Sequence, residues 1–109
     1  MDSRDEKYNL SKIVEKTVCG YFKIKPELIL ARDTSSVVSN ARSIIWHILH
    51  YEYGFSIGDL RKLYFRTDRG IKFRVAYVKN SINNYRHYSD MYYTITENIK
   101  ERSLNTLSK

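Results

Sequence analysis

Apolar residues recur at intervals of three and four along most of this chain, the spacing that places side chains on one face of an α-helix. One such series runs from Val37 to Leu49, and another runs from Ile71 to Ile82. The 109 residues include only one proline and four glycines, so few residues interrupt a helix. We therefore predict an all-α fold, a bundle of five or six helices around one core.

The apolar series and the polar stretches between them set the bounds of the expected helices. These lie at about 11–20, 26–30, 37–53, 57–64, 69–85 and 90–102. Residues 1–9 are polar and charged, and we expect them to form a flexible N-terminus. Residues 10–102 are expected to form a single helical domain, and residues 103–109 a loose C-terminal tail.

Capping signals mark the middle of the chain. Gly54 lies where a glycine commonly ends a helix. Ser56 and Asp59 have the spacing of a capping box at the start of the short helix, with aspartate in place of the usual glutamate. Thr67 or Asp68 can cap the longer helix that follows.

A short helix at about 57–64, a tight turn and a longer helix at about 69–85 follow the order of a helix-turn-helix. Residues 61–79 contain seven basic residues and one acidic residue, a net charge of +6, whereas the rest of the chain carries only +1. A basic cluster with interleaved aromatic residues is typical of a nucleic-acid site. An α-helix fits the major groove of DNA, so the longer helix is the expected recognition helix.

This arrangement predicts two sets of contacts with DNA. The candidates for contact with base edges on the recognition helix are Arg69, Lys72, Phe73 and Arg74. The candidates for contact with phosphates are Ser56, Arg61, Lys62, Arg66 and Lys79.

Five segments of the chain match sequence motifs of a known protein family: residues 13–18, 21–25, 41–43, 56–60 and 75–82. Together they resemble the C-terminal DNA-binding domain of the chromosomal replication initiator protein DnaA, in the Trp-repressor-like helix-turn-helix group, over roughly residues 10–85. The resemblance implies duplex DNA binding in replication or transcription control. It also implies that Arg42, near the start of the long helix, contacts DNA in the minor groove.

The chain departs from that family in two places. The family's Asp-His-Thr-Thr-Val signature is replaced at residues 68–75 by Asp-Arg-Gly-Ile-Lys-Phe-Arg-Val, and the family's basic loop is nearly uncharged at residues 33–36. No Gly-x-x-x-x-Gly-Lys-Ser/Thr loop is present, so we expect no ATPase activity. We expect a stand-alone DNA-binding relative, cytoplasmic and nucleoid-associated, rather than an initiator.

Two other functions remain open. The basic helix could dock an acidic protein, which would make the chain a protein–protein adaptor. Alternatively, the chain could bind a single-stranded nucleic acid by stacking bases on four tyrosines near the last helix: Tyr85, Tyr88, Tyr92 and Tyr93. The same tyrosines could instead form a dimer contact or pack the last helix on the bundle. If the chain binds double-stranded DNA, a second copy of the chain or an accessory protein is a possible partner.

The sequence gives no sign of an enzyme. It has no nucleophile elbow or paired-carboxylate motif, so we expect no catalytic residue and no small-molecule substrate. His47 and His50 lack further ligands at metal-binding spacing, so we expect surface or groove-lining histidines and neither a metal nor a cofactor. Cys19 is expected to be a reduced, partly buried thiol. No apolar run is long enough to cross a membrane.

Overall fold

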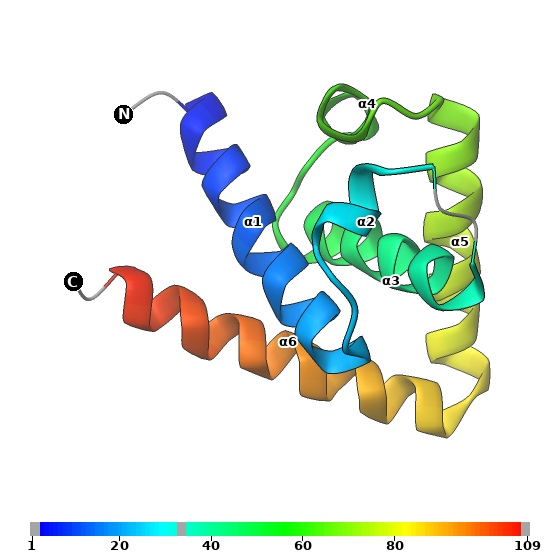
Figure 1. The fold of residues 1–109 in the computed structure, drawn as a ribbon. Coiled ribbons are helices and arrows are strands. Elements are labelled where there is room, and N and C mark those ends of the chain that lie inside the picture. Colours follow the sequence, from blue (N-terminus) through cyan, green and yellow to red (C-terminus); the bar gives the residue numbers. More distant parts are fainter. Residues whose placement is uncertain (1–2, 33–34, 108–109) are drawn as a thin grey trace.

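The computed structural model describes residues 3–32 and 35–107, and within them the chain has six α-helices, one π-helical turn and no strand (Figure 1). The elements are α1 (Ser3–Phe22), α2 (Glu27–Leu30), α3 (Ser36–His47), η1 (Ile48–Glu52), α4 (Ile57–Tyr64), α5 (Asp68–Asn84) and α6 (Arg86–Leu107). The predicted all-α class is confirmed.

Helix α3 lies at the centre of the bundle. Each residue from 41 to 49 is buried, because α1 packs on one side of this helix and α5 on another (Figure 1). Helix α6 returns along α1 and α5. The core joins side chains from all six α-helices, including the fully buried Val18, Ile44, Leu60, Ile71 and Ile95. The apolar spacing of the sequence is thus the spacing of the core.

The two terminal helices are longer than predicted. Helix α1 begins at Ser3 rather than near Ser11, so residues 3–9, expected to be flexible, are helical. Lys7 Nζ lies 2.9 Å from Asp59 Oδ2, and this ion pair joins the first turns of α1 to α4. Such a contact between distant parts of the chain cannot be read from local polarity.

At the other end, α6 spans Arg86–Leu107, whereas the expected helix was 90–102 and the expected loose tail began at residue 103. The hydroxyl of Tyr88 donates to Asn40 Oδ1 at 3.2 Å, which ties the first turn of α6 to α3. Ile95 and Ile99 are fully buried, so the middle of α6 packs on the core. Residues 1–2 and 108–109 lie outside the described residues.

The expected helix at 37–53 is divided into α3 and the π-helical turn η1. Gly54 follows with a φ of +75°, a left-handed conformation that glycine adopts without steric cost. The glycine therefore ends the helix as predicted. The chain then turns back, and the carbonyl of Phe55 lies 2.7 Å from His50 Nδ1.

A partly buried polar network joins α3 and η1 to α6. The Tyr92 hydroxyl lies 2.8 Å from His47 Nδ1 and donates to Glu52 Oε1 at 3.4 Å. His47 is therefore buried rather than on the helix surface. Its pKa is lowered to about 4, because burial disfavours the imidazolium and because His50 and Lys79 add positive charge nearby.

This shift predicts a loss of stability in mild acid. Between pH 6.5 and about 4 the unfolded chain protonates His47 while the folded chain does not, so stability falls as the pH drops through this window. We expect the protonation of His47 to lower the free energy of unfolding by about 1–3 kcal/mol, and to do so only below pH 6.5. Thermal unfolding of the wild type and of His47→Gln at pH 7 and 4.5 measures it. Because only the wild type has the titrating imidazole, the difference in Tm between the two proteins should be smaller at pH 4.5 than at pH 7. An equal difference at both pH values contradicts the prediction.

Candidate nucleic-acid interface

Local capping sets the bounds of α4 and α5, the helix pair that the sequence predicts to form a helix-turn-helix. The Ser56 hydroxyl accepts a hydrogen bond from the Asp59 N–H at 3.0 Å, and Asp59 Oδ2 accepts one from the Ser56 N–H at 3.0 Å. This is the predicted capping box. The Thr67 hydroxyl accepts from the Gly70 N–H at 3.1 Å, so Thr67, rather than Asp68, caps α5. Only residues 65–67 separate the two helices.

Helix α5 has one buried face and one exposed face. Ile71, Val75 and Val78 are buried against the core, as their spacing predicted. The four candidates for base contact on this helix are all exposed: Arg69, Lys72, Phe73 and Arg74. Phe73 is 67% exposed, so its side chain is accessible to a partner.

At 100° per residue, these exposed side chains divide over the helix surface. Arg69 and Phe73 lie at the centre of the outward face, opposite the core. Lys72 and Lys79 lie on one flank, and Lys79 Nζ is 5.5 Å from the centroid of the Tyr51 ring. Arg74 lies on the other flank, which faces α3. A helix set into a groove would therefore present cations to both sides.

The predicted phosphate contacts differ in their surroundings. Lys62 is exposed on α4. Arg61 Nε lies 3.6 Å from Asp68 Oδ1, with both side chains about half exposed, so solvent screens this pair. Arg66 donates to the Ala31 carbonyl at 3.1 Å. The Ser56 hydroxyl, although exposed, is the cap of α4.

Arg42 is the candidate that the structure places away from the exposed surface. Its side chain is only 7% exposed. Nε donates to the Ile29 carbonyl at 2.9 Å, and Nη2 donates to the carbonyls of Leu28 and Ala31 at 3.2 and 3.0 Å. A four-residue helix such as α2 leaves its carbonyls without helical partners, and Arg42 satisfies them. We therefore omit Arg42 from the proposed DNA contacts.

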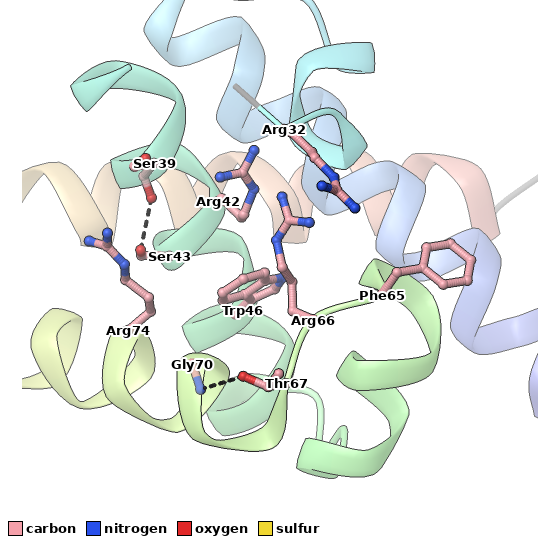
Figure 2. A pocket seen from close by; sticks show the side chains of 10 residues that line it. All are labelled: Arg32, Ser39, Arg42, Ser43, Trp46, Phe65, Arg66, Thr67, Gly70 and Arg74. Atoms are coloured by element: carbon pink, nitrogen blue, oxygen red, sulfur yellow. Dashed lines mark hydrogen bonds between the residues drawn. The ribbon is translucent and has the colours of Figure 1, made fainter. Parts of the chain in front are cut away.

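Beside α5 lies a cavity of about 680 Å³, bounded by α3, the end of α2 and the turn before α5 (Figure 2). Arg32, Arg42, Arg66 and Arg74 line it, together with the indole of Trp46. The sequence analysis did not single out Arg32, because it lies outside the basic stretch. Only the folding of α2 against α3 brings it to α5.

Phe65 is one of the aromatic residues interleaved in the basic cluster, although it was not among the predicted contact residues. It lies in the turn between α4 and α5 with a φ of +56°, a conformation that is rare for a bulky residue. Its N–H donates to the Arg61 carbonyl at 2.9 Å, which closes α4, while its ring is 81% exposed. Neither the backbone conformation nor burial favours phenylalanine at this position, which makes Phe65 a candidate for a contact with a partner.

We expect Phe65→Gly to raise the free energy of unfolding by about 1 kcal/mol, because glycine adopts this backbone without strain. The same variant should weaken the expected binding to duplex DNA, since the exposed ring of Phe65 is lost. Lys23→Gly is the matched control, with a φ of +58° at the end of α1. It should stabilise the fold similarly and leave binding unchanged. Chemical denaturation measures the stability of both variants, and titration with duplex DNA measures their affinity. Unchanged binding by Phe65→Gly contradicts a contact between Phe65 and DNA.

The tyrosines near α6 do not form one exposed surface. Tyr92 is only 3% exposed and belongs to the network with His47, and Tyr88 is half-buried against Asn40. Tyr85 and Tyr93 are exposed. Two of the four rings therefore pack the last helix on the bundle and are not accessible to bases.

Over the described residues, no group of three or more histidine, cysteine, aspartate or glutamate side chains is placed to hold a metal ion. Cys19 is fully buried, and burial together with Glu15 and Glu27 raises the pKa of its thiol to about 11. Within the same part of the chain, no helix is both long and apolar enough to cross a membrane. No protein-family model and no curated protein sequence matches this chain.

Proposed function

We propose that this chain binds double-stranded DNA by placing α5 in the major groove. The observation that carries the proposal is the exposed surface of α5, where Arg69 and Phe73 lie opposite the buried apolar face and Lys72 lies on the flank beside them. Short helix α4 precedes α5 through a three-residue turn, which is the order of a helix-turn-helix.

The chemistry of these side chains suits the edges of base pairs. Arg69, in the first turn of α5, can donate two hydrogen bonds to guanine O6 and N7. The Phe73 ring, one turn further along, can contact a thymine methyl group. Such contacts make binding selective for sequence. A single domain of this size covers little of the duplex, so we propose that a second copy or an accessory protein adds specificity.

The flanks of α5 supply the affinity. Lys72 and Lys79 on one flank, and Arg74 on the other, can neutralise phosphates of the two strands. Lys62 on α4 adds a further cation near the same end of α5. Control of replication or transcription is the role we propose for such a protein, in the cytoplasm with the nucleoid.

The alternatives have less support. A single-strand binder needs exposed rings in a row, but Tyr92 is buried and Tyr88 half-buried. Tyr93→Ala tests stacking, because Tyr93 is exposed and lies outside the network that Tyr92 forms with His47. An adaptor needs only the charge of α5 and leaves the order of α4, the three-residue turn and α5 without a role.

Fluorescence anisotropy with a labelled random-sequence duplex tests the proposal. We expect saturable binding, with a slope of log K against log salt of about −5 if roughly six phosphates are neutralised. A single strand of the same length should compete weakly. Preference for the single strand, with a large effect of Tyr93→Ala, would favour the stacking alternative. No binding to either, with saturation by an acidic protein, would favour the adaptor.

A further inference from the structure

The cavity beside α5 gathers four arginines from separate parts of the chain. Arg32 follows α2, Arg42 lies on α3, Arg66 lies in the turn and Arg74 lies on α5 (Figure 2). Among the described residues that line the cavity there is no aspartate or glutamate. A concave site with one sign of charge concentrates counter-ions of the opposite sign.

Two of these arginines are held close together. Nη2 of Arg42 and Nη2 of Arg66 donate to the same oxygen, the carbonyl of Ala31, at 3.0 and 3.1 Å. An anion beside these two guanidinium groups accepts strong, charge-assisted hydrogen bonds from them.

The wall of the cavity also contains a donor that lacks an acceptor. Trp46 is 3% exposed, and its Nε1 has no hydrogen-bond partner within the part of the chain that the structure describes. Buried N–H groups are almost always paired, so this one points to an acceptor that is supplied from outside. Thr67 and Gly70 add the N-terminal end of the 17-residue helix α5, which favours negative charge.

We propose that this cavity is a phosphate-binding pocket. Arg74 and Arg66 bind the phosphate oxygens, while Arg42 supplies positive charge from the buried side. Two sources can deliver the phosphate group. One is the backbone of bound DNA, which rests on the proposed function, since Arg74 lies on the flank of α5. The other is a free phosphorylated compound, and a volume of about 680 Å³ exceeds what a single phosphate fills.

Trp46 provides the readout, because it is the only tryptophan in the chain and it lines the cavity. Inorganic pyrophosphate is titrated at constant ionic strength while tryptophan fluorescence is recorded. We expect a saturable change in the wild type, about tenfold weaker binding in Arg74→Gln, and unchanged binding in Lys16→Gln. Lys16 is the matched control, with the same charge in an exposed position on α1. No saturable change in the wild type, or equal effects of the two variants, overturns the proposal.

A second titration identifies the source and separates the two proposals. Binding of labelled duplex is followed by anisotropy, with and without pyrophosphate. If pyrophosphate displaces the duplex and Arg74→Gln weakens both, the pocket takes a backbone phosphate. If both bind together, it takes a free compound. If pyrophosphate binds but the duplex does not, the pocket stands and DNA binding fails. If the duplex binds but Trp46 responds to neither ligand, DNA binding stands and the pocket fails.

Discussion

Replacing Arg42 with alanine is expected to destabilise the fold by about 2–4 kcal/mol, because three carbonyl groups lose a charged donor and the buried stem of the side chain leaves a gap. Helix α2 should detach from α3, since these hydrogen bonds join the two. In a domain of this size, each kcal/mol lowers the Tm by about 4 °C or more. Differential scanning calorimetry measures the change.

Arg74→Ala is the control for this prediction. It removes the same side chain from an exposed position on α5 and should change stability by no more than about 0.5 kcal/mol. The resemblance to the initiator family implies a different outcome for Arg42, namely lost DNA binding with intact stability. An Arg42→Ala protein that melts like the wild type would therefore contradict the role in the fold that we assign to this residue.

The double variant Arg69→Ala/Lys72→Ala is expected to lower the affinity for duplex DNA by roughly 100-fold at 0.15 M salt. Each residue removes a charged contact of about 1–3 kcal/mol, and both are exposed, so the fold should be unaffected. Anisotropy with the labelled duplex gives the affinity, and circular dichroism checks the fold.

Lys16→Ala/Lys100→Ala removes the same charge from exposed positions on α1 and α6. At this salt, charges more than about 8 Å from a phosphate are largely screened, so the affinity should fall no more than about threefold. Equal losses in the two double variants would show that net charge, rather than the face of α5, holds the DNA.

Much of the fold follows from local signals in the sequence. Three of these signals involve residues that are close together in the sequence, so they can be predicted without knowledge of the fold. They are the capping box at Ser56, the helix end at Gly54 and the apolar series of α5. The ends of α1 and α6 were missed, because the polar terminal residues depend on contacts with α3 and α4, such as the ion pair between Lys7 and Asp59.

The candidate site divides in the same way. The basic face of α5 was predictable, since helical spacing determines which side chains oppose the core. The burial of Arg42 was not, because its three acceptors lie on a segment that the fold brings against α3. The arginine cavity was missed for the same reason. Arg32 and Arg74 are distant in the sequence, and only the packing of α2, α3 and α5 places both on its wall.

Selection from a random duplex library at about 0.15 M salt is the most direct measurement of whether this chain reads DNA through α5. The bound fraction is sequenced for the wild type and for Arg69→Ala. We predict an enriched motif for the wild type that becomes relaxed at one position in the variant. Absence of any retained duplex, or retention without a motif that is equal in the two proteins, would contradict the proposal that the exposed face of α5 recognises base pairs.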